Sequence, residues 1–432
     1  MSYRRNGSDD WCGWDENERV VRVKIVRRLT RSSRFALISL IIVQGMVLLR
    51  SALIARALGP EQYGIAATFI LLQQFLDSTS DTGLNKYLLS SADGHRRGMV
   101  ATLHAISAWR GGVIAIAMLV VGWPSFSLLG VTSSPLPFAL LAAASLCVGF
   151  SNFDGIRQQR SSDLSALSLG NVLAELIATV AAALLVMVDK SYVVAIYVIL
   201  AKSATATLLS YLLARRPYRI SFNRENAKLI WIYALPLVIN GPLLFFSAQA
   251  ERLVAATALP PAQLGIYTAA LLLIMTPSQL FLRFLGSVFL PALSREIRET
   301  GRHAPLFGRI TLISASVMAT SFAIAGPWII PLVFGPEYKL DWVIVGIIGL
   351  TQAARFARVW SSSLALAYGV TGQILAATSL RLAVLPLCLL GFWYIGGMLG
   401  LAIGALAGEG LTLAYASLSL KRTLARRKVL TE

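Results

Sequence analysis

Charged side chains inside long apolar stretches are the residues of this sequence best suited to chemistry. A cation at the centre of a membrane helix costs roughly 2.5–3.5 kcal/mol, so it must be paired or must bind a ligand. The planar guanidinium of arginine binds phosphate oxygens through two parallel hydrogen bonds. We therefore predict a cationic, phosphate-binding cavity lined by Arg50, Arg110, Arg283, Arg355 and Arg358.

A second group of polar residues recurs every four positions. Gln73, Asp77, Asp81 and Asn85 would share one face of a continuous helix. Lipid cannot solvate such a face, so it must meet protein or water. We predict a polar cavity wall in which Asp77 or Asp81 binds a proton or sodium ion. The alternative is a seam of hydrogen bonds between helices.

Four other charged residues are interpreted as structural ion pairs. Glu175 and Lys202 lie in one half of the chain, and Arg381 and Glu409 lie in the corresponding helices of the other half. Each pair would neutralise itself inside its own half, with the order of the charges reversed. Glu251 and the arginine that follows it are expected at the membrane interface.

Arg283 and Asp81 are expected at similar depth in opposite halves. They could form a salt bridge that closes the cytoplasmic side. Alternatively, Arg283 could hold a phosphate group or extend to the membrane surface. The sequence predicts no partner for the other cations of the proposed cavity, Arg50, Arg110, Arg355 and Arg358.

The elements that position these residues are transmembrane helices. Of 432 residues, 56% are hydrophobic and 14% are charged, whereas about a quarter of the residues of soluble domains are charged. Apolar runs near the roughly 20 residues that cross a bilayer recur along the chain. We predict an all-α polytopic membrane protein with twelve spans: 35–56, 63–90, 100–122, 135–153, 164–188, 192–213, 229–252, 264–291, 309–334, 341–367, 372–395 and 397–420.

The distribution of lysine and arginine predicts the orientation. Both tails and the loops on one side are rich in these residues, and the opposite loops hold little beyond Lys190 and Lys339. The positive-inside rule therefore places both termini in the cytoplasm. The predicted divisions are a basic tail (1–34), an N-terminal lobe (35–213), a basic linker (214–228), a C-terminal lobe (229–420) and a second tail (421–432).

An internal repeat supports two lobes of six helices each. Residues 57–65 read ALGPEQYGI and residues 258–266 read ALPPAQLGI, with an offset of 201 residues. Both segments join an odd-numbered span to the next one. A partial echo, LVFGPEYKL, lies at 332–340. We expect lobes of like orientation, related by an axis along the membrane normal.

These segments carry a resemblance to a known family. RALGPEQYG at 56–64 with DTGL at 81–84, AERLVAATALPPAQLGIYTAA at 250–270 and LVFGPEY at 332–338 resemble Wzx-type polysaccharide flippases. These flippases belong to the multidrug/oligosaccharidyl-lipid/polysaccharide (MOP) exporter superfamily. The resemblance implies a V-shaped pair of six-helix lobes around a central cavity, alternating access, and a bacterial inner membrane.

The function implied by the resemblance is flipping of an undecaprenyl-diphosphate-linked oligosaccharide for O-antigen, capsule or exopolysaccharide synthesis. One alternative is a multidrug/cation antiporter of the same superfamily, which the surplus of cations in the spans disfavours. Another is a membrane polysaccharide polymerase or ligase, which usually needs a larger periplasmic loop. The expected partners are the lipid-linked oligosaccharide and membrane lipids, and could include other polysaccharide-assembly proteins; no nucleic acid is expected.

Signals of enzymatic chemistry are missing from the sequence. His95, His104 and His303 lack metal-ligand partners at useful spacing, and no GxxxxGK[ST] phosphate loop occurs. We expect a protein that is not an enzyme and that has no metal or cofactor, apart from a proton or sodium ion that could couple transport.

Overall fold

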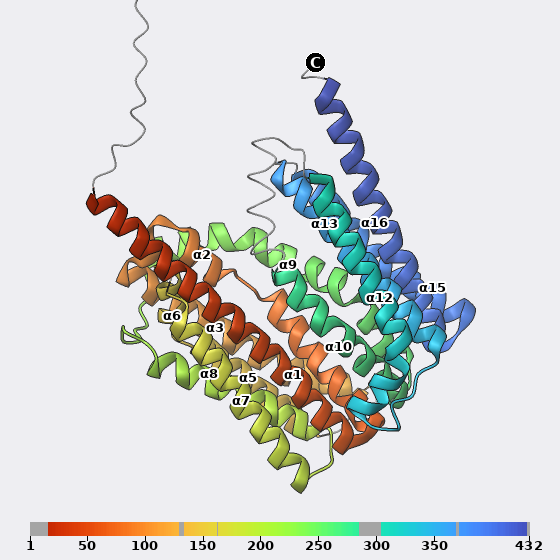
Figure 1. Cartoon of the computed structure of the whole chain (residues 1–432). Helices are drawn as coiled ribbons and strands as arrows, with labels where there is room; N and C mark the ends of the chain where they lie inside the picture. Colours follow the sequence, from red (N-terminus) through yellow and green to blue (C-terminus); the bar gives the residue numbers. More distant parts are fainter. Residues whose placement is uncertain (1–15, 129–133, 162, 285–303, 369–370, 430–432) are drawn as a thin grey trace, which may run out of the picture.

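The computed structural model is a bundle of helices (Figure 1) and describes residues 16–128, 134–161, 163–284, 304–368 and 371–429. No strand occurs in these ranges. The helices are α1 Glu16–Thr79, α2 Leu84–Ser90, η1 Ala92–His95, α3 Arg97–Ala117, η2 Met118–Gly122, α4 Trp123–Leu128, α5 Leu136–Gly149, α6 Asp154–Arg160, α7 Ser165–Val188, α8 Val193–Leu212, α9 Arg224–Ala258, α10 Pro261–Phe284, α12 Ala304–Phe334, α13 Trp342–Ala367, α14 Thr371–Leu380, η4 Arg381–Ala383, α15 Val384–Ile395 and α16 Gly397–Val429.

The helices agree with the predicted fold class. Ten described helices are long and apolar enough to span a membrane, and the bent pair α5 and α6, with an angle of 46°, could form one more. The first of the ten covers two predicted spans, which the structure joins through a kink in α1. An all-α polytopic membrane fold with about twelve spans is thus confirmed.

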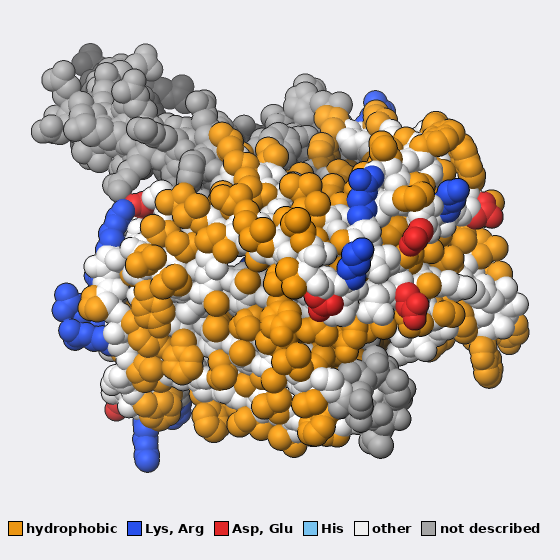
Figure 2. Space-filling view, turned by 90° about the horizontal axis from the view of Figure 1, so that it is seen from below, with side chains coloured by type: hydrophobic (Ala, Val, Ile, Leu, Met, Phe, Trp, Pro, Cys, Tyr) orange, Lys and Arg blue, Asp and Glu red, His pale blue; other side chains and the backbone are white. Residues whose placement is uncertain are grey.

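Much of the protein surface is hydrophobic. Side chains such as Trp109, Val188 and Trp393 are exposed by 75%, 87% and 86%. On the face shown in Figure 2, hydrophobic side chains cover most of the surface, and charged side chains appear in a few small groups. Such a surface is costly in water and favourable in lipid, which fits a protein embedded in a membrane.

A Gly-Pro turn creates the first helical hairpin. Gly59 has φ 75° and ψ 170°, a conformation that side chains with a Cβ rarely adopt. Pro60 then begins the next helical segment, where the missing amide hydrogen costs nothing. In Figure 1 the chain turns back here, so that the red and orange parts of α1 lie beside each other.

The two copies of the internal repeat pack directly against each other. A Cβ atom on Gly64 would lie 1.9 Å from the carbonyl oxygen of Pro261. A Cβ atom on Gly265 would lie 1.9 Å from the carbonyl oxygen of Pro60. Because both contacts join positions related by the 201-residue offset, they form a symmetric pair of backbone contacts between the halves.

The partial echo of the repeat lies at the same end of the molecule. The hydroxyl group of Tyr338 donates a hydrogen bond to the carbonyl oxygen of Ala55 over 2.8 Å, and the ring of Tyr338 lies 6.2 Å from that of Tyr63. Gly335, with φ 119°, makes the turn before Tyr338. All three related sequence segments therefore build one contact region between the halves.

The prediction that the second span continues to residue 90 is wrong. Helix α1 ends at Thr79, and α2 begins only after Gly83, which has φ 62°. The carboxylate of Asp81 accepts a hydrogen bond from the amide of Gly83 over 2.9 Å, which is a turn contact. Asp81 and Asn85 are both exposed, so neither continues the helix face of Gln73 and Asp77.

Candidate functional site

A cavity of about 410 Å³ lies between the two halves of the protein. Its walls come from the segments of α1 before and after the kink at Gly59, from α9 and from α10. Its volume falls within the range of small-molecule sites, roughly 300–1,000 Å³. The lining residues are Gln44, Val47, Gln74, Asp77, Ser78, Gln249, Arg252, Leu272, Met275, Thr276 and Gln279.

Amide side chains dominate the polar part of this cavity. Gln74 and Gln249 meet across the boundary between the halves, where Nε2 of Gln249 donates to Oε1 of Gln74 over 3.3 Å. Each amide offers two hydrogen-bond donors and one acceptor oxygen. These amides can therefore form hydrogen bonds with hydroxyl groups, which both donate and accept.

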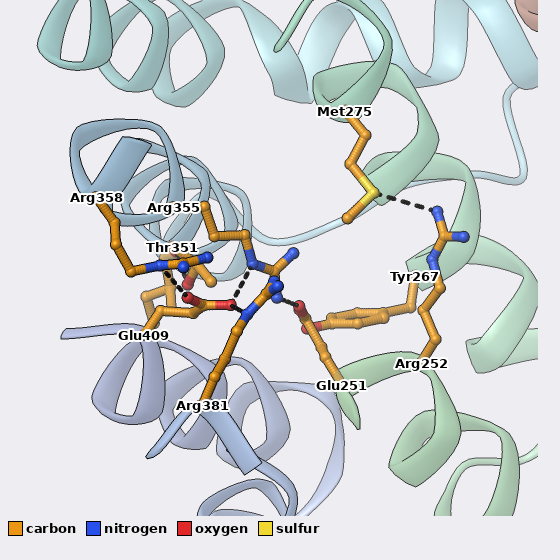
Figure 3. Close-up of polar contacts among 10 residues, drawn as sticks. Glu251, Arg252, Tyr267, Met275, Thr351, Arg355, Arg358, Arg381 and Glu409 are labelled. Atoms are coloured by element: carbon orange, nitrogen blue, oxygen red, sulfur yellow. Dashed lines mark hydrogen bonds and ion pairs between the residues drawn. The ribbon is translucent and has the colours of Figure 1, made fainter. Parts of the chain in front are cut away.

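Arg252 is the cation among the lining residues. Its Nη2 atom lies 3.3 Å from the sulfur of Met275, a weak acceptor. Figure 3 shows the guanidinium pointing toward Met275 and away from Glu251. Its Nε atom is buried without a hydrogen-bond partner among the described residues. The expectation that Arg252 lies at the membrane interface is wrong, because α9 continues to Ala258.

Asp77 is the carboxylate among the lining residues. Its side chain is 44% exposed, accepts a hydrogen bond from Gln73 over 3.1 Å and lies 3.8 Å from Arg110. Gln73 itself also donates to the hydroxyl group of Ser145 on α5, over 3.1 Å. Asp77 therefore lines the cavity, as predicted for a cavity wall. Gln73 belongs to a hydrogen-bonded seam between helices, which was the predicted alternative.

Arg110 was predicted to be unpaired, and this is wrong. Its Nε atom donates to the hydroxyl oxygen of Ser80 over 3.1 Å, and its Nη2 atom donates to the carbonyl oxygen of Asp77 over 3.3 Å. The last carbonyl groups of a helix have no partner within that helix. Arg110 therefore binds the end of α1 where the second span breaks.

A three-residue ion cluster lies inside the N-terminal half. Glu175 has a side chain exposed by 1%, and it accepts hydrogen bonds from Arg50 and, over 2.8 Å, from Lys202. These residues come from α7, α1 and α8. The predicted pair of Glu175 and Lys202 is confirmed. The prediction that Arg50 has no partner is wrong.

A larger ion cluster lies inside the C-terminal half (Figure 3). The carboxylate of Glu409, with a side chain exposed by 0%, lies 2.8 Å from Nε of Arg355 and 2.9 Å from Nε of Arg381. Nε of Arg358 lies 3.8 Å from its other oxygen. The predicted pair of Arg381 and Glu409 is confirmed. The prediction that Arg355 and Arg358 have no partners is wrong.

Glu251 extends this cluster to α9. Its carboxylate accepts a hydrogen bond from Arg355 over 2.6 Å and another from the hydroxyl group of Tyr267. The side chain of Glu251 is exposed by only 3%, so its predicted place at the membrane interface is wrong. Glu251 lies one residue before Arg252, and the helix directs the two side chains to different neighbours.

These contacts overturn the predicted cationic cavity. Arg50, Arg110, Arg355 and Arg358 all pair with carboxylates, and none of them lines the cavity between the halves. Arg283 lies in α10, but its side chain is outside the described part of the structure. Its relation to Asp81 stays a prediction.

The comparison with known proteins identifies the class. A family described as polysaccharide biosynthesis protein matches residues 53–341. The succinoglycan biosynthesis transport protein ExoT of Rhizobium meliloti (strain 1021) is 22% identical over 346 residues, 76% of this chain. The chain spans 66% of the length of that relative.

Solved structures of transporters share the fold. An inward-facing multidrug resistance MATE family transporter of the MOP superfamily matches with a TM-score of 0.66 at 16% identity, over 88% of this chain and 95% of that one. A MOP superfamily transporter from Pyrococcus furiosus matches with a TM-score of 0.60 at 17% identity, over 91% and 95%. The chain therefore shares the fold of these polytopic membrane transporters.

The chain belongs to the polysaccharide biosynthesis protein family. The resemblance to the polysaccharide flippases of the MOP superfamily is thereby confirmed, and the chain is a multi-pass membrane protein.

Proposed function

We propose that this protein flips an undecaprenyl-diphosphate-linked oligosaccharide across the bacterial cytoplasmic membrane during polysaccharide biosynthesis. The family match and the relative in succinoglycan transport support a role in moving polysaccharide intermediates. Both termini would lie in the cytoplasm, as the loop charges predict.

The cavity between the halves is the observation that carries this proposal. Its amide groups suit the hydroxyl groups of sugars, which both donate and accept hydrogen bonds. Arg252 would hold the diphosphate, because its guanidinium has no carboxylate partner of its own in the described structure. The polyprenyl tail would stay in the bilayer, where its apolar surface remains in lipid.

Alternating access would require the halves to separate where the two repeats meet. At Gly64 and Gly265 the two repeats approach each other closely through their backbones. Rocking of one half against the other around a fixed site is the usual motion of transporters built from repeats. We propose that these glycines form the gate on the side opposite the basic loops.

We retain Asp77 as the candidate for ion coupling. It lines the cavity with a partly exposed carboxylate, and its nearest cation, Arg110, is 3.8 Å away. Binding of a proton or sodium ion at Asp77 would weaken its attraction to Arg110, which in turn binds the end of α1. The exposed Asp81 belongs to a turn and offers no comparable link between cavity and helix.

The test is complementation of cells that lack the protein. Arg252→Ala should lose flipping, and lipid-linked oligosaccharide should accumulate in the cytoplasmic leaflet; loss of hydrogen bonds to a charged group costs about 1.5–3 kcal/mol each, so flipping should fall at least tenfold. Arg252→Lys should retain part of the activity, because it keeps the charge without the bidentate geometry.

The matched control is Arg309→Ala, which removes an exposed arginine of α12 that does not line the cavity. It should flip as well as the original protein. Normal flipping by Arg252→Ala at equal protein level would overturn the placement of the diphosphate.

A multidrug or cation antiporter is the second candidate, and the carboxylate of Asp77 in the cavity is the observation that favours it. Efflux of a cationic dye driven by a sodium or proton gradient, and its loss in Asp77→Asn, would support this function. We expect no such efflux, because Arg252 lies in the same cavity and repels cations.

A further inference from the structure

A second pocket, of about 300 Å³, lies within the N-terminal half and outside the cavity described above. It is formed by α3, the α5–α6 connection, α6 and the linker that follows α8, at the end of the bundle that carries α2 and α6 (Figure 1). We call it the basic pocket, because five of its lining residues are arginines: Arg97, Arg157, Arg215, Arg216 and Arg219.

Hydrogen bonds fix the main chain of the linker over this pocket. The carbonyl oxygen of Arg219 lies 2.9 Å from Nδ1 of His104, and that of Arg216 accepts from the side chain of Asn152 over 3.2 Å. The amide of Ser221 donates to the carbonyl oxygen of Ala101 over 3.3 Å. A loop that served only as a positive topology signal would not need its backbone bound in this way.

The side chain of His104 is uncharged and holds neighbouring segments of the pocket in place. Its Nε2 atom accepts a hydrogen bond from the amide of Phe153 over 3.2 Å, so the ring proton lies on Nδ1 and points to Arg219. The ring of Tyr218 packs on His104, with centroids 4.2 Å apart. The imidazole therefore joins α3, the α5–α6 connection and the linker at one buried point.

Carboxylates neutralise only part of the positive charge. Asp154, with a side chain exposed by 2%, pairs with Arg157 over 2.6 Å and accepts from the amide of Arg215 over 2.7 Å. The guanidinium of Arg215 pairs with Asp163 over 2.7 Å. The hydrogen bond from Ser165 and the pairing with Arg215 lower the pKa of Asp163, so this carboxyl group stays ionised.

Two exposed arginines complete the pocket. Arg97 and Arg219 are exposed, and their side chains make no ion pair or hydrogen bond with the described residues. They lie on different segments, α3 and the linker, and both line the same space. Converging guanidinium groups on a fixed backbone are suited to an anion with several oxygens, above all phosphate.

We propose that the basic pocket binds a phosphate group, most directly that of an anionic membrane lipid. The linker joins the two halves and would lie at the cytoplasmic membrane surface, where basic pockets bind lipid headgroups. The apolar residues Val100 and Ala101 line the same pocket and suit the glycerol part of such a lipid. Bound phosphate would hold the linker on α3.

The test measures binding and not flipping, so its outcome is independent of the proposed function. The purified full-length protein is titrated with short-chain phosphatidylglycerol, with phosphatidylcholine of the same chain length, and with inorganic pyrophosphate, while thermal stability is recorded. Phosphatidylglycerol should stabilise the protein and phosphatidylcholine should not. Salt should weaken the effect, because the attraction is electrostatic.

The variant Arg97→Gln/Arg219→Gln should weaken phosphatidylglycerol binding by about tenfold or more, since each charged hydrogen bond contributes at least a tenfold factor. Arg224→Gln, an exposed arginine that does not line the pocket, is the matched control and should bind normally. The single variant Arg97→Gln, with a smaller loss, serves if the double variant does not fold.

The outcomes separate the sources of the phosphate. Stabilisation by phosphatidylglycerol alone would identify a lipid site, and equal stabilisation by pyrophosphate would show that a soluble phosphate compound suffices; both support a phosphate site. Equal binding by the original protein and both Arg97 variants, or an equal loss in Arg224→Gln, would overturn the proposal.

Discussion

At the scale of single residues, three buried carboxylates decide where the positive charge of the membrane helices lies. Glu175, Glu251 and Glu409 are almost fully enclosed, and each is bound to at least one arginine. Arginine inside a membrane is tolerated when it is paired in this way. The ion clusters therefore belong to the interior of each half, and the cavity between them stays nearly neutral.

Removing one of these carboxylates should destabilise the folded protein more than removing one arginine. Glu409→Gln leaves Arg355, Arg358 and Arg381 close together, with Glu251 as their nearest carboxylate. Breaking a buried pair in this way costs about 3–5 kcal/mol. We predict a large decrease in the thermal unfolding temperature of the purified protein. Glu61→Gln, at an exposed position, is the control, and equal stability of the two variants would contradict the structural role of the cluster.

The sequence predicted part of this arrangement. The pairs Glu175–Lys202 and Arg381–Glu409 could be predicted, because each joins mid-helix charges of opposite sign in neighbouring spans. The partners of Arg355 could not, because they lie 54 and 104 residues away along the chain, on α16 and α9. Hydropathy gives the length of a helix but not its rotation, so which arginines face the cavity required the structure.

At the scale of helices, glycine positions decide how closely elements approach and where they turn. The repeat predicted that residues 57–65 join one span to the next, and the chain does turn there, at Gly59 with its positive φ. It could not predict that Gly64 and Gly265 bring the two hairpins into backbone contact. The break after Thr79 was also missed, because Asp81 was counted as part of a helical spacing, although it forms a turn with Gly83.

The close contact of the repeats leaves no room for side chains at its two glycines. Gly64→Ala and Gly265→Ala place a methyl group 1.9 Å from a carbonyl oxygen, so the hairpins must separate. Overpacking of this kind costs roughly 1–3 kcal/mol. We expect a lower unfolding temperature for each variant, together with altered flipping, because this contact closes one side of the cavity in the proposed mechanism.

Gly45→Ala is the matched control in the same helix, since a Cβ atom there would meet nothing within 4 Å. It should be as stable as the original protein or slightly more stable, because alanine favours helices over glycine. If Gly64→Ala and Gly45→Ala unfold at the same temperature, the repeats do not pack as the structure has them.

At the scale of the whole molecule, buried ion clusters lie inside the N-terminal and the C-terminal half, and an amide-lined cavity lies between the halves. Asp77 comes from the N-terminal half and Arg252 from the C-terminal half, and the Gln74–Gln249 contact joins the two. The fold and the family were predictable from the hydropathy, the repeat and the short Gly/Pro segments. The cavity chemistry was not, because it depends on Arg252, which the sequence placed at a helix end.

The most direct test of the proposed flippase function is a flipping assay with the purified protein in vesicles. The purified protein is placed in vesicles that carry a labelled undecaprenyl-diphosphate-linked oligosaccharide, and the fraction of labelled sugar accessible from each side is followed. We predict that the original protein equilibrates or transports the label, that Arg309→Ala does the same, and that Arg252→Ala slows it at least tenfold. Vesicles with folded protein that move no more label than empty vesicles would contradict the central claim.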